Sequence, residues 1–451
     1  MAKPTASQYK VPAKVSISPI MVKGLNAMKM KYKESNVRVG SSGSEIGIEP
    51  YSIAVQYLIA LEVIPFGVIR IMGDPKTRKT TMIQTIVREG MEMRQFNQTR
   101  AEDDYIHGQG MIIATEGKWS ASKQRGVMGP FSEAVSIVHA KVFEEWQEHA
   151  TFMLNTWRKL YDAHRKALCK RKQDRKPADV EAAAQIITPL FLGIDSFTGA
   201  QTRKIQGDVQ TEGSGSKTFQ DRAMIFKQWL ETHAPNLIGY PICVLGTSHQ
   251  SAPIDANGGF GPPKKKAVGG ETGNYMCSLT LDTKLGYDKE CGCHPDALLV
   301  QWQTTMSSLG VDGRKIQIEH FETYDEEGKP VMYFNFDSAL TSLLYNLKVS
   351  EKDKEMGARV VDALGGQFTQ YAVSGKGKFY GCALLGTKNA AQAVEEGLDA
   401  TEFGRRLQTD PDIRAILKKA LRIQPGTIWS PELAAVKDPG VIELPEEEEA
   451  E

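Results

Sequence analysis

Residues 67–81, GVIRIMGDPKTRKTT, decide the fold of this chain. An apolar strand (67–72) runs into a turn that begins at Gly73, and a helical pattern follows over 80–93. A loop between a strand and a helix is the setting that phosphate binding requires, because N–H groups at the start of the helix point at the anion. The sequence therefore predicts a phosphate-binding loop at this place.

Each position of the loop has an expected part in binding a nucleotide. Lys79 can reach the terminal phosphates of ATP, and the Thr80 hydroxyl can hold Mg²⁺. The predicted cofactor-binding residues of the loop are Gly73, Asp74, Pro75, Lys76, Thr77, Arg78, Lys79, Thr80 and Thr81. The usual pattern is GxxxxGK[ST], and Arg78 stands where that pattern has its second glycine. We therefore expect ATP to bind differently here or to be turned over slowly.

Two acidic residues complete the predicted site. Asp195 follows the apolar strand 189–194, where a carboxylate can hold Mg²⁺ through a water molecule. Glu116 follows the strand 110–115, where it can orient or deprotonate the water that attacks the γ-phosphate. Because parallel strands end at one edge of a sheet, we expect both acids to meet Lys79 there. Together the three residues predict a nucleotide hydrolase.

Apolar strands alternate with helical patterns, which indicates an α/β fold with a mostly parallel sheet covered on both faces. The predicted strands are 67–72, 110–115, 189–194 and 240–247. Four regions are expected: an N-terminal arm with a helix at 20–33 (1–50), a core (51–350), a small α+β domain (351–424), and a linker with an acidic tail (425–451). Within the core, 131–184 is predicted to be a helical, basic insertion, and the loops 201–217 and 251–270 are longer than simple turns.

The charge balance conceals oppositely charged regions. The chain has 55 Lys and Arg against 55 Asp and Glu, but residues 443–451 hold six acids and no base. The other 442 residues therefore carry 55 bases against 49 acids, or +6. The segment 158–176 holds nine bases and two acids, which fits either a solvated helical face or a surface that faces nucleic acid.

Membrane and disulfide signals are lacking in the sequence. No run of eighteen apolar residues occurs, and the N-terminus lacks the apolar core of a signal peptide, so we expect a soluble, intracellular protein without a membrane partner. Six scattered Cys residues are too few for a disulfide framework, which agrees with a reducing compartment. The cluster Cys291-Gly-Cys293-His294 hints at a metal, but no second ligand pair at suitable spacing accompanies it, and a turn is the favoured interpretation.

The order of the motifs resembles that of the RecA recombinase family, most closely the RecA-like recombinases that bacteriophages encode. The motifs that carry the resemblance are GVIRIMG (67–73) leading into KTT (79–81), IIATEGKW with Glu116, FLGIDSFTG with Asp195, GTSHQ ending at Gln250, and GGETGN (269–274). The small domain and the acidic tail also have counterparts in bacterial RecA. The resemblance covers roughly residues 20–425 in a consistent order.

This resemblance implies a RecA-like P-loop ATPase core, with a mostly parallel central sheet flanked by helices. It also implies a short N-terminal helix that packs on the adjacent subunit, and a small α+β C-terminal domain. The implied activity is that of a DNA-dependent ATPase that uses ATP and Mg²⁺. Such a protein forms helical filaments on single-stranded DNA and promotes pairing and strand exchange with homologous duplex DNA. By the same resemblance Lys79 and Thr80 bind phosphate and Mg²⁺, Glu116 activates water, Asp195 is the outer Mg²⁺ carboxylate, and Gln250 senses the γ-phosphate.

Two long loops take DNA-binding roles from the resemblance, 201–217 as the first loop and 251–270 as the second. Phe260 can stack between bases, and the basic side chains can neutralise phosphates. The candidate DNA-binding residues are Arg203, Lys204, Lys217, Arg222, Phe260, Lys264, Lys265 and Lys266. The acidic tail is expected to compete with DNA for basic surfaces. The implied setting is the cytoplasm of a bacterial host, with a single-strand-binding protein or a loader as a further partner.

Two other functions share these features. A hexameric helicase or DNA translocase with a RecA core has the same nucleotide site, although the C-terminal domain and the glycine-rich second loop fit a recombinase better. A DNA-coating scaffold that no longer hydrolyses ATP is favoured by Arg78 alone. For Lys264, Lys265 and Lys266, a solvated loop is the alternative to DNA binding.

Overall fold

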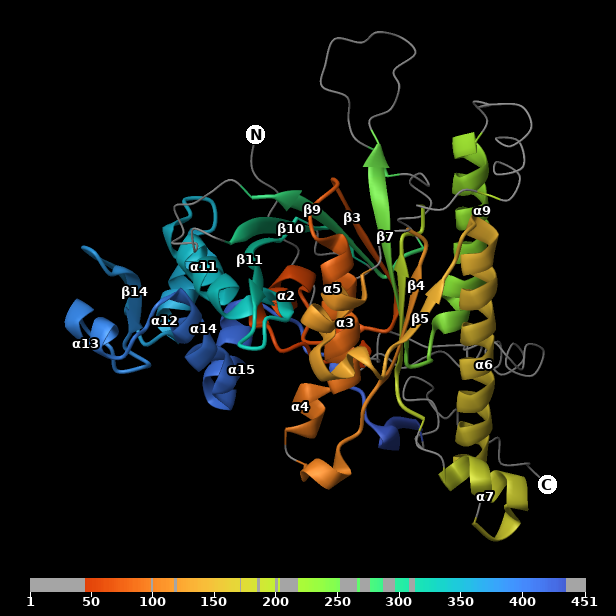
Figure 1. Cartoon of the computed structure of the whole chain (residues 1–451). Coiled ribbons are helices and arrows are strands. Elements are labelled where there is room, and N and C mark those ends of the chain that lie inside the picture. The colour runs from red at the N-terminus through yellow and green to blue at the C-terminus, as the bar shows by residue number, and fades with distance from the viewer. Residues whose placement is uncertain are drawn as a thin grey trace, which may run out of the picture. The chain divides into compact units, whose positions relative to one another are not determined.

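A mostly parallel sheet of ten strands forms the centre of the described chain (Figure 1). The computed structural model describes residues 45–98, 100–116, 120–170, 172–184, 187–198, 202, 218–251, 266–267, 276–286, 297–307 and 313–434. These residues belong to one compact unit, Ser44–Ala435. The strand order is β12 (Pro330–Asn335), β11 (Lys315–Tyr324), β10 (Leu298–Ser307), β9 (Leu279–Leu285), β3 (Gly67–Gly73), β7 (Ile242–Ser251), β6 (Leu190–Asp195), β4 (Gln109–Ala114) and β5 (Ser136–His139), and β8 (Lys266–Ala267) pairs with β7.

The strands from β9 to β5 in this order run parallel. Beyond β9 the sheet continues through β10, β11 and β12, each antiparallel to the strand beside it. Because of this arrangement, the ends of β3 at Gly73, β4 at Ala114 and β6 at Asp195 lie along one edge. All four predicted strands occur and start within two residues of their predicted positions. The predicted α/β class with a mostly parallel central sheet is confirmed.

Helices cover both faces of the parallel strands (Figure 1). On one face α3 (Lys79–Glu92) packs Met82 and Ile83 into the same cluster as Ile69 of β3. On the other face α6 (Phe143–Cys169) and α9 (Thr218–His233) place Trp146 and Phe226 in a cluster with Val68. Val68 and Ile69 are successive residues, so the strand points alternate apolar side chains into two separate cores.

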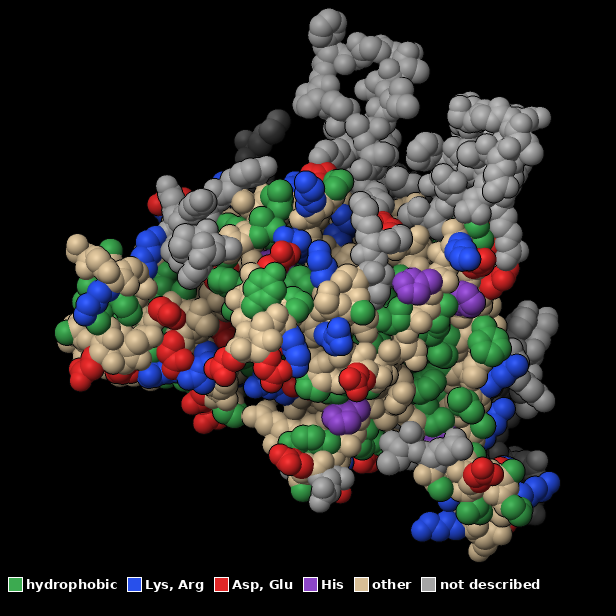
Figure 2. Space-filling model, viewed as in Figure 1, with side chains coloured by type: hydrophobic (Ala, Val, Ile, Leu, Met, Phe, Trp, Pro, Cys, Tyr) green, Lys and Arg blue, Asp and Glu red, His purple; other side chains and the backbone are tan. Residues whose placement is uncertain are grey.

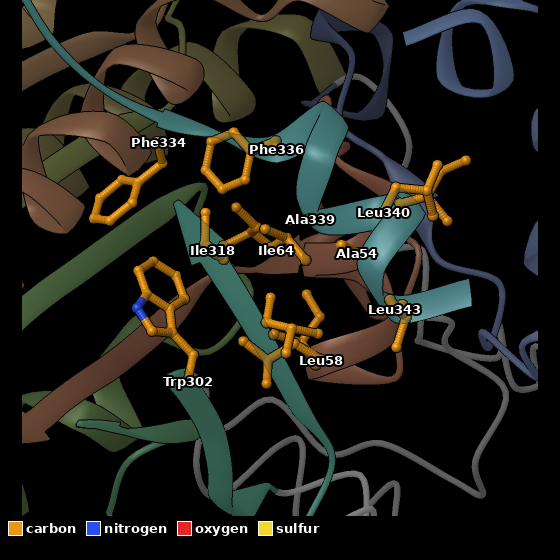
Figure 3. Packing of buried hydrophobic residues seen from close by; sticks show 14 of the residues in the cluster. Ala54, Leu58, Ile64, Trp302, Ile318, Phe334, Phe336, Ala339, Leu340 and Leu343 are labelled. Atoms are coloured by element: carbon orange, nitrogen blue, oxygen red, sulfur yellow. The ribbon is translucent and has the colours of Figure 1, made fainter. Parts of the chain in front are cut away.

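The first of these cores continues beneath the antiparallel strands (Figure 3). Leu58 of α2 (Ile53–Ile59), Trp302 of β10 and Ile318 of β11 pack there with Leu340 of α11 (Phe336–Val349). All four side chains are at most 1% exposed. Burial of this apolar area fixes α2 and α11 against the sheet and so holds the antiparallel strands beside the parallel ones.

The segment 131–184 differs in part from the prediction that it is helical almost throughout. Residues 136–139 form β5, the edge strand beside β4. Helix α6 follows, and a short 3₁₀ turn (Lys172–Asp174) leads to α7 (Pro177–Ala184). The helical prediction is correct for α6 and α7 and wrong for β5. A four-residue edge strand is too short to display the period-two alternation by which strands are recognised.

The residues after α11 form a small α+β module. Its elements are α12 (Lys354–Ala363), β13 (Phe368–Val373), β14 (Gly377–Cys382), α13 (Ala390–Glu395), α14 (Ala400–Thr409) and α15 (Pro411–Ala420). The chain then returns to the core, because β15 (Thr427–Ile428) pairs with β1 (Ile46–Ile48), which pairs with β2 (Ile64–Pro65). Trp429 is only 2% exposed. The predicted linker that starts at 425 is therefore part of the core as far as Trp429.

Among the helices that the structure describes, none has the length and hydropathy of a membrane span.

Candidate nucleotide-binding site

The loop from Gly73 to Arg78 is shaped by residues with positive φ. Gly73 has φ 148°, Lys76 has φ 67° and Arg78 has φ 62°. A Cβ atom on Gly73 would lie 2.2 Å from Thr283 Oγ1 and 2.3 Å from the Thr283 carbonyl oxygen. Glycine is therefore required at the exit of β3 both for its conformation and for its lack of a side chain.

Hydroxyl groups anchor this loop to β9. The Thr77 hydroxyl donates to the Asp74 carbonyl at 2.8 Å and lies 2.7 Å from the Thr283 hydroxyl. Thr283 in turn donates to the Met72 carbonyl at 3.0 Å. Thr283 had no role assigned from the sequence, and it is one of four polar residues in β9. It fixes the loop so that the first N–H groups of α3 point outward from the helix start, where an anion can accept from them.

Lys79 is folded back against the loop at the start of α3. Its ammonium donates to the carbonyl oxygens of Gly73 at 2.9 Å and Asp74 at 2.7 Å, and the residue is 7% exposed. Burial lowers the pKa of Lys79, while the carboxylates of Asp195 and Glu116 act in the opposite direction. The ammonium thus lies in the loop, at the place from which a phosphate-binding lysine must reach its anion.

Thr80 and Asp195 meet across the intervening strand β7. The Thr80 hydroxyl donates to Asp195 Oδ2 at 2.6 Å, and the Thr247 hydroxyl of β7 donates to Asp195 Oδ1 at 2.6 Å. Burial raises the pKa of Asp195, whereas the two hydroxyl donors lower it. The predicted pair is thus brought together, and Thr247 is a further member whose role the sequence did not reveal.

The oxygen atoms of Thr80 and Asp195 suit Mg²⁺, which prefers hard oxygen ligands. Within the described part of the chain, no group of three or more His, Cys, Asp or Glu side chains could hold a metal ion. Thr80 and Asp195 offer one hydroxyl and one carboxylate, and a Mg²⁺ ion bound by so few side chains takes its other ligands from water and phosphate groups.

Glu116 lies at the end of β4, close to the start of the turn after β6. The Ser196 hydroxyl donates to Glu116 Oε1 at 3.2 Å. Thr115 Oγ1 accepts from the Ser196 N–H at 2.7 Å and donates to the Ser196 carbonyl at 3.0 Å. These bonds couple the ends of β4 and β6, so Glu116 and Asp195 are held at one edge as predicted.

Arg78 adopts the left-handed backbone conformation that glycine favours, and its side chain lies against β11. Its φ of 62° is in the left-handed region, and its guanidinium forms an ion pair with Glu322 at 2.8 Å. Burial and the nearby Arg78 charge lower the pKa of His320 to about 4. The guanidinium therefore sits beside β11, while the residue keeps the loop conformation that the usual glycine would adopt.

Replacing Arg78 by glycine and by alanine separates these two properties. A left-handed residue other than glycine costs about 1–2 kcal/mol, and a partly exposed ion pair contributes about 0–1 kcal/mol. Both variants lose the ion pair, but only Arg78→Gly removes the backbone strain. We expect Arg78→Gly to be more stable than Arg78→Ala by about 1 kcal/mol in urea denaturation. Equal stability of the two variants would show that residue 78 is not left-handed.

The other predicted residues lie partly or wholly outside the described residues. Arg203, Lys204, Lys217, Phe260, Lys264 and Lys265 lie outside, as do the 20–33 helix, Cys291, Cys293, His294 and the acidic tail. For Gln250, Arg222 and Lys266 the structure describes only the backbone, on β7, α9 and β8 respectively. In the β7–β8 pairing, Gln250 is opposite Ala267 and Ser251 is opposite Lys266. The chain thus leaves β7 at the carboxyl edge and returns beside it.

A cavity of about 480 Å³ lies apart from this site. Its lining includes Arg88 and Glu89 of α3, Phe321 of β11 and Tyr333 of β12, and none of the loop residues 73–81. Burial raises the pKa of Glu89 to about 7.

Comparison with protein family models finds no match to this chain, and comparison with curated proteins finds none. The function must therefore be inferred from the fold and from the geometry of the site. These define a mostly parallel α/β protein with a strand–loop–helix unit, one lysine, three hydroxyl groups and two carboxylates at the carboxyl edge of its sheet.

Proposed function

We propose that this protein is an ATP-dependent DNA strand-exchange protein with a RecA-like core. The observation that carries the proposal is the contact of Thr80 with Asp195 at 2.6 Å, beside Lys79 and Glu116. Residues from β3, β4 and β6 converge there, although 115 positions separate Thr80 from Asp195. This convergence supports a phosphoryl-transfer site, since such sites need a lysine, a hydroxyl, a metal carboxylate and a water-orienting group together.

ATP hydrolysis at this site follows from the roles of the named groups. The N–H groups at the start of α3 and the Lys79 ammonium bind the phosphates. Thr80 and Asp195 would hold Mg²⁺, which would supply positive charge to offset the charge that develops on the transferred phosphoryl group. Glu116 accepts a proton from water as the water oxygen bonds to the γ-phosphorus and the bond to the β,γ-bridging oxygen breaks, which yields ADP and phosphate. Ser196 orients Glu116 by donating to its carboxylate.

The proposed DNA contact lies at the same edge of the sheet. Strand β7 carries Thr247, which donates to Asp195, and then continues through Gln250 to the point where the segment 252–265 departs. A shift at the phosphates that alters the Thr247 contact would therefore act on the same strand that leads into this segment. Basic loops at 201–217 and 251–270 would bind the DNA backbone with little sequence preference.

The test combines turnover with imaging. We expect ATP hydrolysis to be stimulated by single-stranded DNA, and the protein to form extended filaments on that DNA with a non-hydrolysable ATP analogue. Closed rings under the same conditions would favour a translocase instead. Coating of DNA that is independent of nucleotide, without hydrolysis, would favour a scaffold. The Lys79→Ala variant is the control, because it should lose both turnover and nucleotide-dependent filaments.

A further inference from the structure

Helix α6 is much longer than the sheet on which it packs. Its 27 residues span about 40 Å at 1.5 Å per residue, whereas the six residues of β6 span about 20 Å. The helix starts four residues after β5 ends, at the carboxyl edge, and therefore runs back past the amino edge. Tyr240, just before β7, marks that edge, because its hydroxyl donates to Asp162 of α6 at 3.0 Å.

The described residues 163–170 and 172–184 therefore extend beyond the sheet, and we call them the α6–α7 projection. In Figure 1, α7 lies at the opposite end of the sheet from the tip of β7. The ATP site and the predicted DNA loops belong to the carboxyl edge, so the projection is separate from both. Any ligand of the projection could be bound while that edge is occupied.

The projection is held in a defined shape by polar contacts. Lys170 Nζ donates to Asp179 Oδ1 at 2.7 Å and to Oδ2 at 2.8 Å. His164 Nδ1 lies 2.8 Å from the Ala182 carbonyl oxygen, and Arg175 donates to the Leu168 carbonyl at 3.2 Å. These bonds fasten α7 to α6 although α7 has no buried residue. The basic side chains are therefore presented on a preformed scaffold.

The charge of this scaffold is mainly positive. Six described residues of the projection are bases (Arg165, Lys166, Lys170, Lys172, Arg175 and Lys176), against the acids Asp174, Asp179 and Glu181. Three of the lysines, Lys166, Lys172 and Lys176, are exposed and form no ion pair with another described side chain. Figure 2 shows Lys and Arg side chains gathered on the far end of α6 and around α7.

We infer that the α6–α7 projection binds the sugar–phosphate backbone of duplex DNA. Lysines contact phosphates without reading sequence, and a preformed helical pair fits a stiff duplex. Proteins that hold single strands add aromatic side chains on which unpaired bases stack. Residues 163–184 contain no Phe, Tyr or Trp, so the chemistry favours a paired partner. The inference rests on the proposed function in one respect, since that function requires a homologous duplex as the second DNA.

The test reverses three charges on the projection and three elsewhere. Lys166→Glu, Lys172→Glu and Lys176→Glu are combined in one variant. The matched control combines Lys329→Glu, Lys352→Glu and Lys354→Glu, which are also exposed and change the net charge by the same amount. Binding of each protein to labelled duplex DNA, without single-stranded DNA, is measured by fluorescence anisotropy over a salt series. DNA-stimulated ATP hydrolysis is measured in parallel.

We expect the projection variant to bind duplex at least about tenfold more weakly at 0.1 M salt, with a salt slope smaller by about 3, because each lost phosphate contact removes about 0.9 from the slope. Its single-stranded-DNA-stimulated ATP hydrolysis should stay within about twofold of the parent protein, and the control should retain both properties. A variant with Lys→Gln at the same three positions should show a smaller loss in the same direction, which separates charge loss from misfolding.

Unchanged duplex binding in the projection variant would overturn the inference. If that variant at the same time lost binding to a peptide of residues 443–451, an acidic polypeptide would be the ligand instead. Failure of the proposed function looks different: the parent protein would show no DNA-stimulated ATP hydrolysis, while duplex binding would still depend on Lys166, Lys172 and Lys176.

Discussion

Replacing Glu116 by glutamine is expected to lower the rate of ATP hydrolysis by about 10²- to 10⁴-fold, the usual contribution of a general base. Glutamine keeps the size of the side chain and can still accept from the Ser196 hydroxyl, but it cannot take the proton of the attacking water. Because Glu116 follows β4 and the predicted phosphate-binding loop follows β3, ATP binding should change by less than about threefold. Single-turnover hydrolysis and equilibrium binding of a fluorescent ATP analogue measure the two quantities.

A matched control for Glu116→Gln is Glu133→Gln, the same chemical change at an exposed position. This variant should hydrolyse ATP at the parent rate. Lys79→Ala should differ from both by losing ATP binding as well as turnover, because the Lys79 ammonium lies inside the loop against the Gly73 and Asp74 carbonyl oxygens. Full activity of Glu116→Gln would remove Glu116 from the catalytic role and leave another group to activate the water.

Replacing Arg414 by methionine is expected to lower the free energy of unfolding by about 3–5 kcal/mol, the cost of breaking a buried ion pair by removing one partner. Arg414 and Glu49 have side chains that are 7% and 8% exposed, and two guanidinium nitrogens lie 3.0 and 2.9 Å from Glu49 Oε1. The same guanidinium donates to the carbonyl oxygens of Tyr51 at 2.6 Å and Pro50 at 2.8 Å. Lys418 still pairs with Glu49, so the loss should fall at the lower end of this range.

The control for this variant is Arg405→Met. Arg405 also pairs with a glutamate, Glu402 at 2.7 Å, but its side chain is 51% exposed. Solvent screening limits such a pair to about 0–1 kcal/mol. Urea denaturation of both variants should therefore show a large loss for Arg414→Met and a small one for Arg405→Met. Similar losses in the two variants would contradict the buried network.

The effect of Arg414→Met should also depend on pH. Burial on its own would raise the pKa of Glu49, but Arg414 and Lys418 together outweigh burial, and the pKa is lowered. A carboxyl group with a lowered pKa in the folded state stabilises the protein above its unfolded pKa, and that stabilisation is lost as pH falls through the folded value. The difference between the parent and Arg414→Met should therefore be full near neutral pH and should narrow below about pH 4.5.

The strands of the core and the main site residues could be predicted because their signals are local. An apolar run, a glycine turn and a helical pattern lie within residues 67–93, and the acids Glu116 and Asp195 each follow an apolar strand. The strand β5 and the pairing of β15 with β1 were not predictable, since each is short and is stabilised by partners distant in the chain. Tertiary pairing decides such segments more than their own propensity does.

The hydroxyl groups that support the site could not be predicted from the sequence, for a related reason. Thr247 reaches Asp195 over 52 positions, and Thr77 reaches Thr283 over 206. Only the pairing of β6 with β7 and of β3 with β9 brings these residues together. Threonine is common in strands for its shape alone, so nothing in its identity marks it as part of a site. The roles of Gln250 and of the two long loops stay predictions.

The pairing of β15 with β1 changes how the small α+β module is attached. The chain enters the module from α11, which is packed in the core, and leaves it into a strand that is part of a core sheet. The module is therefore topologically an insertion with two stems, and it is not a terminal appendage on one tether. The module also shares the buried apolar cluster of the core, which contains Phe403 and Leu407 of α14 together with Leu340 of α11. A single cut at either stem would therefore leave the module held by the other stem, by this shared cluster and by Arg414.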